Sequence, residues 1–200
     1  MRDFLLLFLP TYFLLFFGFA FLWRSWRTYK LTGINPYALS NNPGAEQVTN
    51  RYFRLLPLLS LTVMVLYLLG DGYYALLAPI PWLEWPLLQW SGLVLMSVAL
   101  VVILVSQGQM GKSWRIGVDY ENPTEFVQAG LFRYSRNPIF LGLVLSVAGF
   151  FLLLPNALTL LIMMLDLALI QVQIRIEEQY LAAAHGKVYE DYCKAVRRWI

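Results

Sequence analysis

Two stretches of an otherwise apolar chain hold the polar residues that could do chemistry. One is residues 108–137, which ends with Arg136 and Asn137 directly before a proline; the other is residues 171–178, which contains two consecutive glutamates. Free N–H groups at a helix start and an arginine fork favour a carboxylate or phosphate. Glutamates favour an ammonium or a sulfonium. If the fold brings the two stretches together, they form a pocket suited to a zwitterion with an amino acid end.

The same residues also have ordinary structural explanations. Asn137 would cap the helix that follows it, and the arginines would anchor that helix at the lipid headgroups. Consecutive glutamates where a helix leaves the membrane most often form a solvated face. Two features favour a binding site instead. Gln171 and Gln173 lie where a membrane span should still be apolar, and Gln173 and Glu177 are four residues apart, so they share one helix face.

The composition identifies an integral membrane protein. Of the 200 residues, 59% are hydrophobic and 14% are charged, whereas soluble domains are about 45–50% apolar and about 25% charged. The net charge of +3 therefore does not predict nucleic-acid binding. A single cysteine, Cys193, excludes an internal disulfide, and with a single histidine, His185, it leaves no metal cluster of these residues. We expect neither a metal nor a nucleic acid as a partner.

Five apolar segments predict an all-α fold with five transmembrane helices. A helix needs roughly 20 apolar residues to cross the hydrocarbon core. The candidates are residues 4–23, 55–78, 87–106, 138–154 and 157–174. Only Pro155 and Asn156 separate the last two, which permits nothing longer than a tight hairpin between antiparallel helices. This hairpin predicts that the arginine-asparagine-proline step and the two glutamates are spatial neighbours.

The basic residues predict the orientation of these five spans. Lysines and arginines cluster between spans one and two, between spans three and four, and after span five, whereas the opposite side has only Arg2. By the positive-inside rule, the N-terminus is outside and the C-terminus cytoplasmic. We therefore expect three N-terminal helices in residues 1–107. Residues 108–200 would supply a cytoplasmic loop, the hairpin 138–174 and a cytoplasmic helical extension.

Four short motifs in the second half of the chain resemble the isoprenylcysteine carboxyl methyltransferase family and its phospholipid-methyltransferase relatives. Those enzymes carry a Gly-hydrophobic-aromatic turn, an Arg-His-Pro-x-Tyr step, a Glu-Glu-x-x-Leu segment and a Phe-Gly-x-x-Tyr-x-x-Tyr tail. The matching sequences here are GLF, RNPIF, EEQYL and HGKVYEDY, in the same order. The resemblance covers about residues 108–200. It departs from the family pattern at Asn137, which replaces a histidine, and at Phe140, which replaces a tyrosine.

The resemblance implies methyl transfer from S-adenosylmethionine (SAM) to a lipophilic acceptor at the cytoplasmic face. By position, the cofactor site would comprise Thr124, Glu125, Phe126, Val127, Phe132, Asn137, Pro138, Ile139, Phe140 and Glu177. The zwitterion argument adds Arg136 and Glu178 to this cofactor site. Gln173 would contact the acceptor. No catalytic residue is predicted, because displacement from a sulfonium needs alignment and exclusion of water more than an acid–base pair.

The identity of the acceptor stays open at this stage. A prenylated cysteine, an isoprenoid acid, a thiol and a phospholipid amine are all compatible, and each would enter from the bilayer while SAM arrives from the cytoplasm. The compact form and the two departures from the family pattern favour a prokaryotic inner membrane. An amine acceptor would have to lose a proton, and His185 is the only imidazole, predicted at a helix break.

Two other functions, and two carboxylates that fall within predicted spans, remain to be weighed. An NADPH-dependent reductase of the sterol-reductase type should carry more spans and more basic residues. A membrane scaffold without enzymatic activity would leave the polar residues at 108–137 and 171–178 unexplained. Asp166 lies in the middle of a predicted span and is expected to face the bundle interior. Asp71 lies near the outer end of another span and is expected to reach water.

Overall fold

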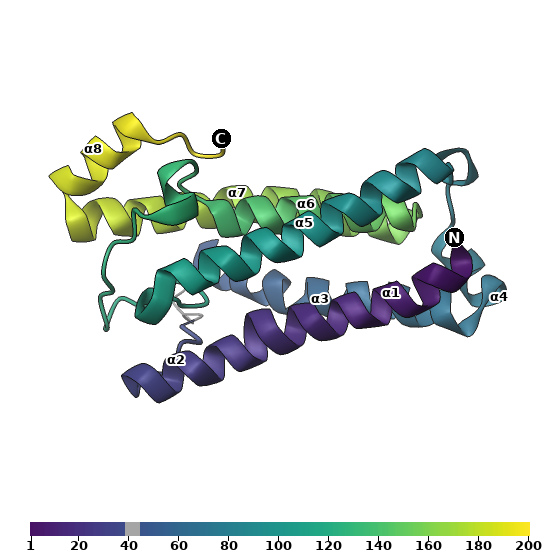
Figure 1. Ribbon diagram of the computed structural model, residues 1–200, viewed down its shortest axis with the longest axis horizontal. Helices are drawn as coiled ribbons and strands as arrows, with labels where there is room; N and C mark the ends of the chain where they lie inside the picture. The colour runs from purple at the N-terminus through teal and green to yellow at the C-terminus, as the bar shows by residue number, and fades with distance from the viewer. Residues whose placement is uncertain (39–44) are drawn as a thin grey trace.

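The computed structural model describes residues 1–38 and 45–200 as a bundle of long helices (Figure 1), and no strand occurs among these residues. The first rod is continuous from α1 (Arg2–Leu15) through a π-helical segment (Phe16–Trp23) to α2 (Arg24–Thr32). Beside it lie the other long helices, α3 (Ala45–Leu69), α5 (Pro86–Met110) and α7 (Ala157–His185), and the shorter α6 (Pro138–Leu153). The all-helical prediction is confirmed.

Four of these rods are long and apolar enough to cross a membrane. They are Arg2–Thr32, Glu46–Leu69, Pro86–Ser113 and Ala157–His185. The fifth predicted span, α6, has 16 residues and is about 24 Å long, shorter than the roughly 30 Å of a hydrocarbon core. The chain is thus built as an integral membrane protein, while five crossings remain a prediction.

The second predicted span differs from the helix that forms. Residues 55–78 were expected as one helix, but α3 ends at Leu69 and Gly70 breaks it with a φ of 125°. A short helix, α4 (Asp71–Tyr74), follows the break. The connection between the first two spans lies between Thr32, where α2 ends, and Ala45, where α3 starts; residues 39–44 lie outside the described part of the chain.

The predicted hairpin between α6 and α7 is confirmed. Asn156 is fully buried and caps α7: its side chain accepts from the backbone N–H of Thr159 at 2.9 Å. The Thr159 hydroxyl in turn accepts from the backbone N–H of Asn156 at 3.2 Å, which completes a capping box. The two helices therefore run antiparallel from this turn.

Helices α5 and α6 approach each other closely through glycines. A Cβ added to Gly92 of α5 would lie 2.7 Å from the carbonyl oxygen of Gly149 on α6, and one added to Gly149 would meet the Gly92 carbonyl oxygen at the same distance. Gly142 leaves similar room for Ile103. Small residues at such contacts are typical of packed transmembrane helices, because they let the backbones approach.

The C-terminal extension folds back on the end of the bundle. Helix α7 continues beyond the predicted span to His185, and Gly186 then breaks it with a φ of 51°. A second helix, α8 (Lys187–Ala195), packs Tyr189 and Tyr192 into a small apolar cluster together with Val196, which directly follows it. Helix α8 lies at one end of the bundle and the N-terminus at the other (Figure 1).

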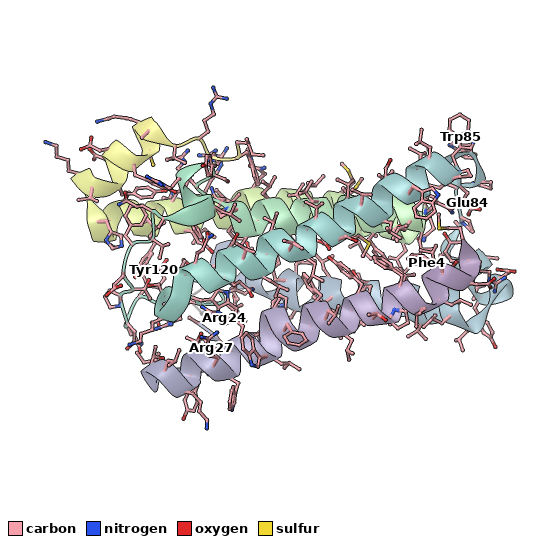
Figure 2. The ribbon with its side chains drawn as sticks, viewed as in Figure 1. Phe4, Arg24, Arg27, Glu84, Trp85 and Tyr120 are labelled. Atoms are coloured by element: carbon pink, nitrogen blue, oxygen red, sulfur yellow. The ribbon has the colours of Figure 1, made fainter. Side chains whose placement is uncertain are left out.

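The two ends of the bundle differ in the side chains that they carry. Arg24, Arg27 and Tyr120 lie at the end that holds α2 and the loop after α5, while Glu84 and Trp85 lie at the end that holds the N-terminus (Figure 2). Between the two ends, a core of buried side chains joins the long helices. Its fully buried members include Leu5, Leu9, Leu56, Val63, Met96, Leu153 and Ile162.

Candidate functional site

An elongated cavity of about 570 Å³ runs into the bundle between α1, α3, α5, α6 and α7. Its volume lies within the range of about 300–1,000 Å³ that is typical of small-molecule sites. One end is polar, and the rest is an apolar arm lined mostly by aromatic and aliphatic side chains. The polar lining of the first end consists of Arg54, Gln107, Arg115, Arg136, Asn137, Gln173 and Glu177.

Glu177 contributes a carboxylate without a cationic partner to the polar end. Gln173 donates to it from Nε2 at 3.2 Å, and no arginine or lysine of the described residues forms an ion pair with it. Gln173 itself is buried and lines the cavity beside Glu177. The prediction that these two side chains share one face of a helix is confirmed.

Glu178 faces away from the cavity and fixes the C-terminal tail. Its two oxygens accept from Arg198, from Nε at 3.1 Å and from Nη2 at 2.6 Å. Arg136 lies 3.4 Å from Glu178 Oε1, which confirms that the hairpin brings the two polar stretches together. Successive side chains on a helix point about 100° apart. Glu177 therefore faces the cavity, while Glu178 contacts Arg198 and Arg136.

Asn137 occupies the position just before α6, yet its side chain does not cap the helix. Its side-chain amide donates to the carbonyl oxygen of Arg198 at 3.2 Å, and its backbone N–H donates to Ser135 Oγ at 3.1 Å. The capping alternative considered from the sequence is therefore wrong. Asn137 is buried at the cavity wall together with Pro138.

The remaining residues of the predicted proline step also line the cavity. Ile139 and Phe140 follow Pro138 along the wall made by α6, and Phe132 adds an aromatic ring from the turn before it. The hydroxyl of Tyr192 donates to the Phe132 carbonyl oxygen at 2.6 Å. Burial raises the pKa of Tyr192 to about 12, so this hydroxyl keeps its proton at neutral pH.

The predicted cofactor loop lies beside the cavity rather than in its wall. Thr124, Glu125, Phe126 and Val127 are absent from the residues that line it. Phe126 instead packs its ring 5.0 Å from that of Tyr192 and stacks on His185 at 5.2 Å. The loop thus packs against α8 beside the cavity, and its contact with a cofactor stays a prediction.

The turn before Arg136 depends on a glutamine that the sequence did not single out. Gly130 adopts a φ of 66°, which favours glycine, and its backbone lies against the side chain of Gln109. Gln109 Oε1 accepts from the backbone N–H of Leu131 at 2.7 Å. The Gly-hydrophobic-aromatic motif therefore specifies a turn held by the end of α5.

The N-terminal half supplies much of the apolar arm, although nothing in its sequence assigned it to a site. Phe16, Phe17 and Phe21 of the π-helical segment line the cavity. Gln107 donates to the carbonyl oxygen of Ala20 at 3.0 Å, which satisfies a backbone group in this segment. Short π-helical stretches occur frequently at functional sites, where they re-aim side chains.

The segment after α5 adds a further wall that the sequence left unassigned. Trp114, Ile116 and Gly117 line the polar end beside Arg115. Arg115 lies 3.6 Å from a carboxylate oxygen of Asp119, and both side chains are mostly buried. Its place in the polar stretch 108–137 was the available signal for this arginine.

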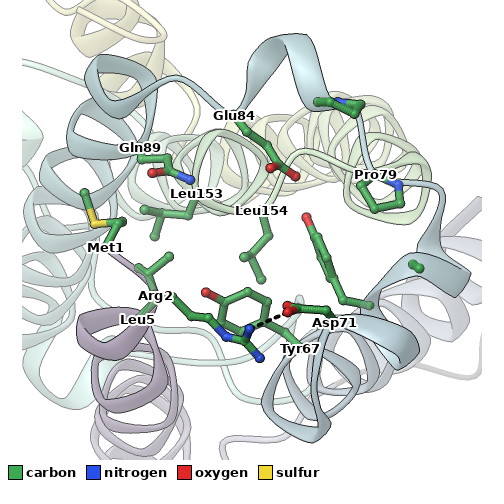
Figure 3. A pocket seen from close by; sticks show the side chains of 13 residues that line it. Met1, Arg2, Leu5, Tyr67, Asp71, Pro79, Glu84, Gln89, Leu153 and Leu154 are labelled. Carbon is green, nitrogen blue, oxygen red and sulfur yellow. Dashed lines mark hydrogen bonds and ion pairs between the residues drawn. The ribbon is translucent and has the colours of Figure 1, made fainter.

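A second cavity of about 400 Å³ lies at the opposite end of the bundle (Figure 3). Arg2 and Asp71 form an ion pair of 2.5 Å at its edge, and the Asp71 side chain is 80% exposed. The expectation that Asp71 reaches water is confirmed. None of the residues predicted for cofactor or acceptor lines this second cavity.

Together these features define a membrane-embedded helical bundle with a buried cavity that joins a polar end to an apolar arm. Comparison with family models matches residues 87–188 to the phospholipid methyltransferase family. The match covers half of the chain and includes every residue of the polar end except Arg54, so the protein belongs to the phospholipid methyltransferase family. The predicted resemblance is confirmed. A search of curated proteins found no match.

Proposed function

We propose that this protein is a SAM-dependent methyltransferase that modifies a lipophilic acceptor within the membrane. Family membership supports methyl transfer over NADPH-dependent reduction or a scaffold role. The observation that carries the proposal is the continuity of the cavity: one space joins an uncompensated carboxylate, Glu177, to an apolar arm. A soluble charged cofactor and an apolar acceptor could therefore meet there.

The residues of the polar end fit the methionine end of SAM. Glu177 lacks a cationic partner and would accept from the ammonium group. Arg136 and Arg115 lie on the same cavity and would attract the carboxylate; the Nε groups of both are buried and make no hydrogen bond. The rings of Phe132 and Phe140 would lie against the positive sulfonium, a contact that aromatic faces stabilise.

Methyl transfer from a sulfonium needs little general acid–base catalysis from the protein. When bound, SAM would supply an electrophilic methyl group, with S-adenosylhomocysteine as the leaving group. The walls formed by α5 and α6 would align the acceptor atom with that bond and keep water out. Gln173, beside Glu177, would contact the acceptor where the polar end meets the apolar arm.

The membrane arrangement belongs to the same proposal. We place the cavity's polar end, the C-terminus and α8 on the cytoplasmic side of a prokaryotic inner membrane, with five crossings and the N-terminus outside. The acceptor would enter from the bilayer. The distribution of arginines and lysines supports this orientation, since Arg24 and Arg27 lie at the end of the bundle opposite Glu84 and Trp85 (Figure 2).

Calorimetric titration of the purified protein in detergent tests this function. We expect saturable binding of SAM and of its demethylated product, S-adenosylhomocysteine, and no binding of NADPH. Absence of binding for both sulfur ligands would refute the proposal. Saturable NADPH binding would instead favour a reductase.

A further inference from the structure

Asp166 is a carboxylate in the middle of a transmembrane helix, and it faces the apolar arm of the cavity. The expectation that it points into the bundle is confirmed. Among the described residues it has neither a hydrogen-bond partner nor an ion pair. An aspartate at the centre of a membrane helix is costly to insert into a bilayer, and such residues usually mark functional sites. A side chain this costly, which faces a cavity and has no partner among the described residues, suggests a partner within that cavity.

Tyr12 and Ser146 form a second polar group at the same depth. Ser146 precedes Pro155 by nine residues and Asp166 follows Asn156 by ten, so the antiparallel hairpin places them at one level. The hydroxyls of Tyr12 and Ser146 are 2.7 Å apart and both residues line the cavity. Three helices thus supply polar atoms at one depth of an arm that is lined mostly by apolar side chains.

This level is remote from the polar end. Along α6, Ser146 lies nine residues beyond Asn137, or about 13 Å at 1.5 Å per residue. Along α7, Asp166 lies eleven residues, or about 16 Å, from Glu177. Between Asn137 and Ser146, α6 lines the cavity with Pro138, Ile139, Phe140 and Leu143, none of which has a polar side chain.

The three side chains together present both an acceptor and a donor. The Asp166 carboxylate accepts hydrogen bonds. Only one hydroxyl of the Tyr12–Ser146 pair can donate in their mutual hydrogen bond, so the pair keeps one further O–H to donate. An ammonium group could only donate and an ether could only accept. A hydroxyl does both, and it is far less costly to bury than a charge.

We propose that Asp166, Tyr12 and Ser146 form a hydroxyl-binding subsite, and that the methyl acceptor is a lipid with a hydroxyl group at mid-membrane depth. This inference rests on the proposed function, because it assumes that the acceptor occupies the apolar arm. The subsite lies too far from Glu177 and Asn137 to receive the methyl group. Its role is to select and position the acceptor.

The test uses three probes that differ only at one end: decan-1-ol, decyl methyl ether and decylamine. Each probe is titrated into the full-length protein in the same detergent. The variant Asp166→Leu is titrated in parallel, because partition of a probe into micelles affects both proteins equally and cancels in the comparison. We expect the wild type to bind the alcohol about tenfold more tightly than the ether, the scale of one or two hydrogen bonds. Asp166→Leu should abolish this preference.

Two controls keep the result specific. Asp71→Leu removes a carboxylate outside the cavity and should leave the preference for the alcohol intact. Asp166→Asn and Tyr12→Phe preserve side-chain shape, and each should reduce the preference even if Asp166→Leu folds poorly. Equal binding of alcohol and ether by the wild type would overturn the subsite, and tighter binding of decylamine would overturn its assignment to a hydroxyl.

SAM binding, measured on the same samples, separates this inference from the proposed function. We expect the SAM affinity of Asp166→Leu to stay within about twofold of the wild type, since the subsite lies about 16 Å from Glu177. If the wild type does not bind SAM, the methyltransferase proposal is refuted. Normal SAM binding without any preference for the alcohol would refute the subsite alone.

Discussion

Glu177 and Glu178 are adjacent on α7, yet one faces the cavity and the other holds the tail through Arg198. Glu177→Gln keeps the side-chain shape and removes the charge that would bind the ammonium of SAM. We expect the SAM affinity to fall by at least tenfold, because hydrogen bonds to charged groups contribute about 1.5–3 kcal/mol. Calorimetry of the variant measures this loss.

The matched control for this variant is Glu121→Gln, which neutralises an exposed glutamate that does not line the cavity. It should bind SAM as the wild type does. Since Glu177→Gln removes a charge that has no cationic partner, its melting temperature should not fall. Wild-type affinity in Glu177→Gln would contradict the assignment of the methionine end to this carboxylate.

At the scale of residues, the sequence predicted which charged side chains near the hairpin lie close together, but it missed contacts that depend on how the C-terminal segment folds back. The neighbourhood of Arg136 and Glu178 followed from the short hairpin. The bond between Glu178 and Arg198 could not be foreseen, because it depends on the direction in which Gly186 turns α8. The loop around Phe126 was assigned to the cofactor by resemblance, whereas its ring packs against α8.

At the scale of elements, the contact between α5 and α6 positions the wall that carries Asn137 and Ser146. We expect Gly92→Leu to force these helices apart, because even its Cβ would lie 2.7 Å from the Gly149 carbonyl oxygen. Overpacking of this kind costs about 1–3 kcal/mol or more. A drop in melting temperature of about 5 °C or more, measured in detergent, is the expected result.

Gly108→Leu is the control in the same helix, since a Cβ at Gly108 has nothing within 4 Å. Its melting temperature should stay within about 2 °C of the wild type, as expected for a substitution away from packed contacts. If Gly92→Leu and Gly108→Leu have the same melting temperature, the close approach of α5 and α6 does not determine stability.

The C-terminal tail is a second element whose position affects the site. Two kinds of contact hold the tail over the start of α6. The backbone carbonyls of Arg197 and Arg198 accept hydrogen bonds from Arg136 and Asn137. The side chain of Arg198 also donates to Glu178. Arg198→Ala should release this segment and leave Glu178 with a single arginine partner. Trypsin, which cleaves after exposed Lys194 and Arg197, should then cut the tail several-fold faster than in the wild type.

Asp191→Asn provides the comparison for the tail. It breaks an ion pair with Lys194 whose side chains are 74% and 56% exposed, and exposed pairs contribute only about 0–1 kcal/mol. Its cleavage rate should match the wild type. Equal rates in Arg198→Ala would show that the contacts of Arg198 do not restrain the tail.

At the scale of the whole molecule, the sequence predicted a helical membrane protein and the hairpin, because apolar length and turn residues are local signals. It gave no sign that α1 and α3 line the cavity, since an apolar side chain in a span looks the same whether it faces lipid, core or ligand. The break at Gly70 was missed because apolar residues resume after Asp71 and Gly72 and extend to Ala78.

The orientation of the bundle is the last property that follows from the distribution of charge. In a Cys193→Ser background, Trp85→Cys and Lys187→Cys each place one thiol at an exposed position, near opposite ends of the bundle (Figures 1 and 2). A membrane-impermeant maleimide should label Trp85→Cys in intact cells and Lys187→Cys only after lysis. The opposite pattern would reverse the orientation, and labelling of both in intact cells would contradict five crossings. In that case α6, which has only 16 residues, would pack beside α7 without crossing the membrane.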